Sequence, residues 1–578
     1  MTPPPDRRQV AAVLEEVAAL MDLKGENPFK SRAYQAAART VESLGEDLGS
    51  LVSEGRLRRL KGIGPAIAEA IATLVTTGKL PLHEQLKIEI PGGLLEMIRI
   101  PGLGPRRAHL LHKQLGLASV EDLEAACRSG RLSGVAGFGA KSQEKILQGI
   151  AFLRRQVGSL LLSDATRLAE GLLEALRGQR HVARCALAGS LRRRKDVVRD
   201  VDLLASHSKG IPAQAVIRAF VSLPLVEQVL AAGDTKASIL TGTGRQVDLR
   251  VVSEKEFPFA LHYFTGSAGH NIALRRRAQA LGMKINEYGL WKGARRIPCR
   301  DEEEIFARLG LAWIPPELRE DWGEIEAAEA GTLPRLVEAG DLRGVLHVHS
   351  TWSDGRDSLE AMVKAATDRG AEFIGISDHS RTAVYAGGLG LEQVRAQKKE
   401  IEGLRRRHPG LTILHGTESD ILRDGSLDYP AELLAELDFV IGSVHSQLAL
   451  PEAEQTARVI KAIENPYLTC VGHPTGRLLL QRDGFAIDLE RVLQAAAAHR
   501  KLVEVNASPN RLDLDWRGCR RARELGVAVS INPDAHDAEE LADVAYGVDT
   551  ARRGWLAAGD VANTRPWPAM KAMVGAGA

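Results

Sequence analysis

The sequence has few cysteines and no long hydrophobic run. No segment approaches the ~20 consecutive apolar residues that a transmembrane helix needs, and the first residues contain no apolar signal core. Neither membrane spanning nor export is therefore indicated. The cysteines do not form the Cys-x-x-Cys spacing typical of zinc knuckles, so we expect buried, reduced thiols in a cytoplasmic protein. They are Cys127, Cys185, Cys299, Cys470 and Cys519.

Net charge is small for the chain as a whole, but its two parts differ. The formal charge is +2, whereas the residues from 341 onward hold 28 Lys and Arg against 34 Asp and Glu, which leaves the preceding part at +8. A basic front part fits a polyanionic partner, and an acidic back part with clustered histidines fits a cation-binding site. The length of 578 residues predicts several domains, about three to five.

A segment near residue 190 combines a small-residue turn with two acids. The turn is Gly189-Ser190, and Asp200 and Asp202 follow one residue apart in an apolar strand, so they project from one face. A third acid, Asp248, lies in another strand, and we expect antiparallel pairing to bring it beside them. Three carboxylates can hold two Mg²⁺ ions for an in-line displacement. The turn offers N–H and hydroxyl donors to a triphosphate.

This pattern resembles the nucleotidyltransferase site of family X DNA polymerases. The resemblance implies that Asp200, Asp202 and Asp248 are catalytic and bind Mg²⁺ or Mn²⁺. It continues into Tyr263-Phe264-Thr265-Gly266-Ser267, which is similar to the turn of the family's thumb that lies against the nucleotide. The implied nucleotide-binding residues are Gly189, Ser190, Arg193, Tyr263, Phe264, Gly266 and Asn271, with Arg275 on the templating strand.

Three short segments in the front part share two glycines before a helical pattern, at residues 60–65, 100–105 and 135–140. Glycines permit a tight turn between two helices, and the exposed N–H groups of the second helix can bind a phosphate without reading a base. The segments resemble helix-hairpin-helix motifs. The glycines expected to contact DNA are Gly62, Gly64, Gly102 and Gly104.

The helix after the first hairpin departs from animal relatives. In those relatives the helix carries lysines, one of which forms a Schiff base with an abasic sugar. This chain has Ala66 and Ala70 at the matching positions. Because an alanine cannot be an amine nucleophile, we expect no deoxyribose-phosphate lyase activity from this helix.

From Gly344 onward the chain alternates strand and helix seven times. The expected strands lie near residues 345–349, 373–377, 411–415, 439–444, 468–472, 502–506 and 528–532. Such a series predicts a parallel barrel with its chemistry at the carboxyl ends of the strands. Candidate ligands follow those ends: His347, His349, Asp354, His379, Glu418, His445, His473, Asp534 and His536. Nine such groups could hold three divalent ions, Zn²⁺ or Mn²⁺ or both.

This set resembles the polymerase and histidinol phosphatase (PHP) domain, a distorted barrel that hydrolyses phosphoesters. The resemblance implies a first ion on His347, His349, Glu418 and Asp534. It implies a second ion on Asp354, His379 and His536, and a third on His445 and His473, with Glu418 as a bridge. Three other histidines are interpreted as structural: His408, His415 and His499.

Taken together, the chain is identified as a member of the bacterial family X DNA polymerases with a C-terminal PHP domain. The implied fold is multidomain α/β, with these parts: an N-terminal helical DNA-binding domain (1–85), helix-hairpin-helix fingers (86–155), a polymerase beta-like palm (156–255), a thumb (256–315), a linker (316–342) and a distorted (β/α)7 PHP barrel (343–578).

The implied function is template-directed filling of short gaps in base excision repair. A monomer would act on gapped or primed DNA with deoxynucleoside triphosphates and without a membrane. The PHP domain would add a 3'-to-5' exonuclease and an AP endonuclease or 3'-phosphatase. Three alternatives stay open: a template-independent nucleotidyltransferase, a non-catalytic DNA-binding scaffold, and a polymerase fused to a small-molecule phosphatase.

Overall fold

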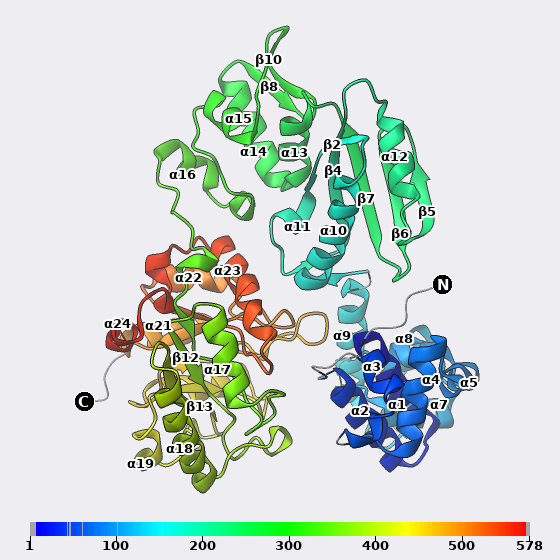
Figure 1. Cartoon of the computed structure of the whole chain (residues 1–578), viewed down its shortest axis with the longest axis vertical. Coiled ribbons are helices and arrows are strands. Elements are labelled where there is room, and N and C mark those ends of the chain that lie inside the picture. The colour runs from blue at the N-terminus through cyan, green and yellow to red at the C-terminus, as the bar shows by residue number, and fades with distance from the viewer. Residues whose placement is uncertain are drawn as a thin grey trace. The chain divides into compact units, whose positions relative to one another are not determined.

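The computed structural model describes residues 7–42, 44, 48–60, 62–100, 102–156 and 158–573 (Figure 1). The chain divides into two compact units, Met1–Val157 and Gly158–Ala578. Among the described helices, none is both long enough and apolar enough to cross a membrane. All five cysteines are free thiols, and four of them are buried, as the sequence predicted; Cys185 is only partly buried.

The first unit is helical. One hydrophobic cluster extends from Val10 to Ile150, so the two helical domains expected from the sequence share a core. Local signals fix several helix starts; for example, the Ser119 hydroxyl accepts a hydrogen bond from the Asp122 N–H. The helices are α1 (Arg7–Lys24), α2 (Pro28–Glu42), α3 (Leu48–Ser53), α4 (Pro65–Thr77), α5 (Pro81–Glu89), α6 (Gly92–Met97), α7 (Pro105–Leu115), α8 (Val120–Arg128) and α9 (Ala140–Gln156), with single 3₁₀ turns η1 (Leu57–Arg59) and η2 (Arg131–Gly134).

The glycine pairs adopt one recurring geometry. The first glycine of each pair has a left-handed backbone, with φ of +83° at Gly62, +82° at Gly102 and +86° at Gly137. In the first two pairs the second glycine, Gly64 or Gly104, is the N-cap of the following helix, with proline at the first helical position. Both N-cap glycines are exposed. The expected hairpins are therefore present; residues 61 and 101 lie outside the described part.

The palm is a five-stranded sheet in the order β2 (Val182–Leu187), β4 (Val201–His207), β7 (Gln246–Val252), β6 (Lys236–Thr241) and β5 (Val226–Ala232). Strand periodicity divides it into two faces. Val201 and Leu203 pack on the face covered by α10 (Leu162–Arg177) and α12 (Ala213–Val221). Leu204 packs on the opposite face, against α13 (Phe257–Thr265). The acids at 202 and 248 share the second face by the same alternation.

The pairing of the two acid-bearing strands corrects the sequence prediction. We expected β4 and β7 to be antiparallel, but they are parallel, with Asp202 opposite Asp248. The antiparallel neighbour of β7 is β6, which directly precedes it in a hairpin. The connection from β4 to β7 is long and contains α12, and a crossover of this kind permits parallel pairing.

The thumb follows the palm. It contains α13, α14 (Ala268–Ala280), a small antiparallel sheet and α15 (Glu302–Arg308), and the sheet strands are β8 (Met283–Asn286), β9 (Gly289–Lys292) and β10 (Arg295–Ile297). The range suggested as a linker contains η3 (Pro316–Leu318), α16 (Glu324–Ala330) and η4 (Ala339–Asp341). It contributes Leu318, Ile325 and Leu336 to the hydrophobic cluster of the thumb. Three short elements of the palm precede β4: β1 (Leu160–Leu161) pairs with β3 (Val197–Val198), and α11 (Gly189–Arg192) carries the small-residue turn.

The back part is a nearly closed barrel of seven parallel strands in sequence order. The strands are β11 (Gly344–Val345), β12 (Phe373–Ile376), β13 (Thr412–Asp420), β14 (Phe439–Ser443), β15 (Cys470–Val471), β16 (Leu502–Asn506) and β17 (Val529–Asn532). A bridge between Val348 and Ala535 joins the segments that follow β11 and β17. The residues of these strands are almost continuously buried because helices cover the sheet. These helices are α17 (Leu359–Asp368), α18 (Leu391–Arg407), α19 (Ala431–Leu434), α20 (Glu452–Ile463), α21 (Leu489–Ala498), α22 (Trp516–Glu524), α23 (Val544–Arg553) and α24 (Trp567–Met573), with the 3₁₀ turns η5 (Val384–Ala386), η6 (Glu540–Asp543), η7 (Ala558–Asp560) and η8 (Ala562–Thr564).

Candidate metal centres

Three carboxylates meet on the palm. One oxygen from each of Asp200, Asp202 and Asp248 lies within 4.8 Å of the other two. Asp200 stands just before β4 and Asp202 is its second residue, while Asp248 lies directly across from Asp202 on β7. Burial, together with the charges of Asp200 and Asp248, raises the pKa of Asp202 to about 6. Carboxylates this close repel one another unless protons or cations neutralise them, so the cluster fits divalent cations.

The small-residue turn closes over this cluster. Gly189 has a φ of +59°, and a Cβ built on it would stand 2.0 Å from Oδ2 of Asp202. Only glycine permits this approach. A further positive charge, which the sequence did not point to, comes from Lys236, whose Nζ lies 3.5 Å from Oδ2 of Asp248. Arg193 is buried nearby; its Nε donates to Glu320 Oε1 at 3.0 Å, and its Nη1 donates to the Thr265 carbonyl.

Of the thumb residues named from the resemblance, Tyr263 and Phe264 lie at the end of α13, Gly266 follows it, and Asn271 and Arg275 lie in α14. Nδ2 of Asn271 donates to the Tyr263 carbonyl at 2.8 Å, and Nε of Arg275 donates to the Asn271 carbonyl at 3.2 Å. The rings of Tyr263 and Phe264 make an edge contact with centroids 5.2 Å apart. A Cβ on Gly266 would lie 3.1 Å from Nη1 of Arg193, so the two segments meet there. These residues are held together as one block beside the palm.

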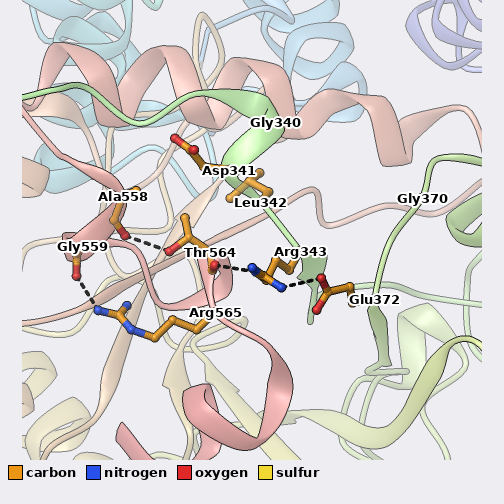
Figure 2. Close-up of a pocket in the computed structure, with 10 residues that line it drawn as sticks. All are labelled: Gly340, Asp341, Leu342, Arg343, Gly370, Glu372, Ala558, Gly559, Thr564 and Arg565. Atoms are coloured by element: carbon orange, nitrogen blue, oxygen red, sulfur yellow. Dashed lines mark hydrogen bonds and ion pairs between the residues drawn. The ribbon is translucent and has the colours of Figure 1, made fainter.

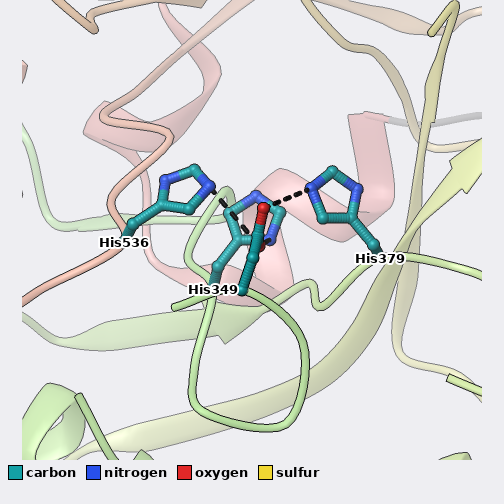
Figure 3. Close-up of side chains that lie close together, drawn as sticks. His349, His379 and His536 are labelled. Atoms are coloured by element: carbon teal, nitrogen blue, oxygen red, sulfur yellow. Dashed lines mark ion pairs between the residues drawn. The ribbon is translucent and has the colours of Figure 1, made fainter. Parts of the chain in front are cut away.

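Imidazoles and carboxylates converge at the mouth of the barrel. Figure 3 shows His349, His379 and His536 with their rings facing a common space. These three form one group with Asp354, a second group is His347, His349 and Asp534, and a third is His379, Glu418 and His445, each with ligand atoms within 4.8 Å of one another. His473 joins through its Nε2, which lies 3.0 Å from Oε1 of Glu418. All nine residues expected from the sequence are therefore in one cluster.

Electrostatics in the cluster reflect burial and mutual charge. Burial alone would raise the pKa of Glu418, but His445, His347 and His379 hold it well below its ordinary value. Burial, together with the charges of the neighbouring His536 and His379, lowers the pKa of His349 to about 4. The Glu418 carboxylate is thus anionic and the His349 imidazole is neutral, and these are the forms in which these two side chains bind a metal.

Unsatisfied atoms test whether the cluster fits a cation. Neither His347 nor His349 has any exposed side-chain surface, and Nε2 of His347 and Nδ1 of His349 have no hydrogen-bond partner. A buried nitrogen left unpaired is unfavourable by about 1–3 kcal/mol. The donor set of imidazole nitrogens and carboxylate oxygens suits Zn²⁺ or Mn²⁺.

Sequence reasoning did not identify the residues that orient these ligands. Oε1 of Glu504 lies 2.7 Å from Nδ1 of His347, and its Oε2 accepts the His473 N–H at 2.8 Å. Oδ1 of Asp420 lies 2.6 Å from Nδ1 of His445. The signal for Glu504 was present, because it is an acid in the middle of an otherwise apolar strand.

The histidines interpreted as structural stand away from the ligand groups. His415 is buried, its Nε2 lies 3.1 Å from Oε1 of Gln397, and burial lowers its pKa to about 4. His408 and His499 are the C-cap residues of α18 and α21. His415 thus contacts a helix side chain and the other two stand at helix ends, and the ligand groups of the described residues contain none of the three.

A cavity of about 560 Å³ lies at the other end of the barrel, next to the starts of β11 and β12 (Figure 2). Its charged side chains are already paired: Arg343 with Glu372, and Arg565 with the Gly559 carbonyl. None of the nine ligand candidates lines it. We therefore assign it no part in the chemistry.

Family models match four stretches of the chain. A helix-hairpin-helix domain matches residues 5–80, and a SAM-like helix-hairpin-helix tandem matches residues 94–151. The DNA polymerase beta thumb matches residues 260–320, and the PHP domain matches residues 346–508. These stretches lie in the helical unit, the thumb and the barrel, and the PHP match ends before β17.

Curated proteins match the whole chain or its parts. The "DNA polymerase/3'-5' exonuclease PolX" of Bacillus subtilis (strain 168) is 38% identical over 565 residues, 97% of each chain. The DNA polymerase lambda of Rattus norvegicus is 26% identical over 54% of this chain and 55% of its own. A probable phosphatase of Caldanaerobacter subterraneus subsp. tengcongensis is 30% identical over 34% of this chain and 77% of its own.

Proposed function

This chain belongs to the bacterial family X DNA polymerases that carry a C-terminal PHP domain, and on that premise we propose that it joins a DNA-directed DNA polymerase to a 3'-to-5' exonuclease. The two activities use separate sites. The palm extends a primer with deoxynucleotides, and the barrel removes nucleotides from a 3' end. The observation that carries the proposal is that the second unit contains two distinct groups of potential metal ligands, one on the palm sheet and one at the barrel mouth.

In the polymerase site the chain supplies ligands and phosphate donors. Asp200, Asp202 and Asp248 hold Mg²⁺ or Mn²⁺, and the close approach of Gly189 to Asp202 supports this grouping. The Ser190 hydroxyl and the backbone N–H groups of the turn hold the triphosphate, with Arg193 adding charge. Tyr263, Phe264, Gly266 and Asn271 contact the nucleotide, and Arg275 contacts the templating strand.

In the nuclease site nine residues hold up to three divalent ions, Zn²⁺ or Mn²⁺ or both. They are His347, His349, Asp354, His379, Glu418, His445, His473, Asp534 and His536. Divalent cations bound at either site supply charge stabilisation at a reacting phosphate. Glu418 stands in the centre, with Oε1 within 3.2 Å of His445 Nε2 and 3.4 Å of His347 Nε2.

The helical unit positions the DNA. Exposed N–H groups at Gly62, Gly64, Gly102 and Gly104 bind backbone phosphates, which fixes register without reading sequence. Such binding suits short gaps, so we place the enzyme in base excision repair as a monomer acting on gapped or primed DNA. Ala66 is exposed and Ala70 is buried, and neither offers an amine nucleophile to the first hairpin, because an alanine side chain carries no nitrogen. No lyase activity is expected from it.

Two variants test the division of labour. Asp200→Ala combined with Asp202→Ala abolishes filling of a one-nucleotide gap and leaves degradation of single-stranded DNA from its 3' end, assayed with Mn²⁺. His349→Ala does the reverse. His408→Ala, which removes a histidine outside the cluster, keeps both activities. If either of the first two variants is folded and lacks both activities, the two-site proposal is wrong.

A second candidate for the barrel is hydrolysis of phosphomonoesters, because its relatives include probable phosphatases. Within repair, this activity corresponds to removal of a 3'-phosphate, and cleavage at an abasic site is the related diester reaction. Comparing a DNA end that carries a 3'-phosphate, an abasic duplex and histidinol phosphate as substrates ranks these activities. Faster turnover of the small phosphate would assign the barrel to small-molecule chemistry.

A further inference from the structure

Two exposed apolar side chains stand beside the metal-ligand cluster. Val384 and Tyr385 have 81% and 72% of their surface exposed. Within the described part of the barrel, residues 343–573, they are the large apolar side chains with this degree of exposure. They are adjacent in η5, in the loop that begins at the ligand His379. Leaving two such neighbours in water is unfavourable, so a binding role is favoured at this place.

The Tyr385 ring faces the cluster. Its centroid lies 6.2 Å from the ring of His379 and 6.4 Å from the ring of His445, in tilted and edge arrangements. These two histidines belong to one group of potential ligands with Glu418. A molecule whose phosphate reaches the ligand group therefore brings its neighbouring parts against Tyr385.

The loop that carries these residues is anchored on both sides. The Thr382 N–H donates to Oδ2 of Asp428 at 2.8 Å, and the Gly388 N–H donates to the Ala383 carbonyl at 3.0 Å. A Cβ on Gly388 would stand 1.9 Å from the Ser380 carbonyl oxygen, so the end of the loop is packed against its start. The exposed ring is thus presented on a fixed turn, and little ordering is needed on binding.

A positively charged side chain, Arg511, also lies next to the metal-ligand cluster. Nε of Arg511 lies 3.5 Å from Oδ2 of Asp534, and its side chain keeps 20% of its surface exposed. Arg511 provides a cation for a phosphate next to the ligand group, while Tyr385 and Val384 provide an apolar face. A nucleotide within a DNA strand fits such a surface, because it has a phosphate next to a flat base.

We propose that Tyr385, with Val384 beside it, is a stacking platform for the base of the 3'-terminal nucleotide of a DNA strand bound at the barrel mouth. This inference rests on the proposed exonuclease function and adds the feature that selects a nucleic-acid end over a smaller phosphoester. Stacking of a base on an aromatic ring contributes about 1–3 kcal/mol. The platform is sequence-tolerant, because every base has a flat face.

The test compares two single-stranded oligonucleotides that are identical except at the last residue, which carries a base in one and is an abasic tetrahydrofuran in the other. With Mn²⁺, the wild-type enzyme removes the base-bearing residue about 5- to 150-fold more efficiently, as kcat/KM. Tyr385→Ala removes both residues at similar rates. Tyr385→Phe keeps the preference, because its ring stacks equally well. Tyr288→Ala, which removes an exposed tyrosine of the thumb, serves as the matched control and keeps it too.

Each outcome has one meaning. Equal rates for the two ends with the wild-type enzyme, or an unchanged preference in Tyr385→Ala, would refute the platform. Loss of the preference in Tyr385→Phe would move the role from the ring to the hydroxyl and would also refute it. Absence of 3' degradation of either oligonucleotide by the wild-type enzyme would instead refute the exonuclease function. Gap filling by each variant confirms that it is folded.

Discussion

Arg477 of the barrel donates from Nη2 to Oδ2 of Asp196 in the palm, at 2.8 Å. Arg553 of α23 donates to the other oxygen of the same carboxylate at 2.9 Å. Asp196 precedes the acid Asp200 by four residues, and Arg477 follows the ligand His473 by four. One carboxylate therefore joins the segments that lead to the two clusters of candidate metal ligands.

Apolar packing reinforces this contact. Leu512, from the loop after β16, is fully buried in the hydrophobic cluster of the palm, and Leu479 and Tyr546 pack against the same cluster. The Arg477 and Arg553 charges outweigh the effect of burial and lower the pKa of Asp196. The palm core is thus completed by residues of the barrel, and the carboxylate is ionised within it.

Asp196→Asn should weaken folding strongly. The substitution keeps the volume of the side chain but leaves Arg477 and Arg553 without a buried anionic partner, a loss of about 3–5 kcal/mol for a buried pair. Urea unfolding of the full chain, followed by tryptophan fluorescence, measures the effect. Asp164→Asn, which breaks an exposed pair with Arg167, changes the free energy of unfolding by less than about 1 kcal/mol. Similar effects of the two changes would contradict the role of Asp196 as an anchor.

Gly189→Ala should inactivate the polymerase without affecting the nuclease. The new Cβ would stand 2.0 Å from Oδ2 of Asp202, so the carboxylate must move. A displacement of about 1 Å in a catalytic group lowers the rate on the order of 100-fold. Gap filling and 3' degradation, measured on the same preparation, check this.

Gly210→Ala is the matched control for that change. Gly210 has a φ of +80°, but a Cβ there would have no heavy atom within 4 Å. The left-handed backbone is strained to the same extent, about 1–2 kcal/mol, without a collision at the active site. Gap filling should be retained, and a comparable loss in both variants would show that backbone strain alone explains the effect.

In the palm, sequence periodicity predicted the faces of the strands but not the direction of their pairing. Alternation in β4 placed Val201 and Leu203 in the core and turned Asp202 to the other face, which the structure bears out. The predicted direction of β7 relative to β4 was wrong, because periodicity gives the face on which a side chain lies and not the direction of the neighbouring strand. In the structure β7 pairs antiparallel with β6 on one edge and parallel with β4 on the other.

The free energy of unfolding should fall as the pH rises from about 4 to 6, because of the buried carboxyl group of Asp549. Burial raises its pKa to about 6 despite the nearby Arg194, so the folded protein binds a proton that the unfolded chain, near the ordinary value of 3.8, has released. Stability is favoured where the proton stays bound, below that range, and is lost as pH increases. Asp549→Asn removes the contribution of this residue to the pH dependence and stabilises the protein at pH 8 by up to about 3 kcal/mol. Unfolding curves between pH 4 and pH 8 measure it, and a pH profile unchanged by the substitution would count against it.

In the barrel, the sequence predicted the candidate metal ligands but not the residues that hold them in place. Histidines and acids at strand ends could be named from the sequence because the strand pattern fixes where each strand stops, and all nine meet at the mouth. Their supporting groups could not be named, since the partner of His347 is Glu504, 157 positions away. An acid in an apolar strand signals a buried partner, but only the closed barrel shows which one.

Glu504→Gln should weaken metal binding and nuclease activity together while leaving gap filling intact. Both oxygens of Glu504 accept hydrogen bonds, from His347 and Asn532 on one side and from the His473 N–H and Asn506 on the other. In Glu504→Gln one carboxylate oxygen becomes an NH₂ group, whose hydrogens face groups that themselves donate hydrogen bonds. The side chain therefore no longer holds His347 in its orientation. Loss of such a supporting group lowers metal affinity or activity about 10- to 100-fold.

The measurement is metal content per chain after dialysis against Mn²⁺ or Zn²⁺, alongside 3' degradation of single-stranded DNA. Glu324→Gln is the matched control, because Glu324 holds Nδ1 of His270 at the same 2.7 Å and is equally buried, but in the thumb. It should leave metal content at the barrel and 3' degradation unchanged. Because the two pairs share distance, burial and chemistry, a loss of metal in Glu504→Gln alone isolates the orienting role of this carboxylate from the general effect of breaking a buried Glu–His pair. Equal metal content in both variants would assign Glu504 to packing only.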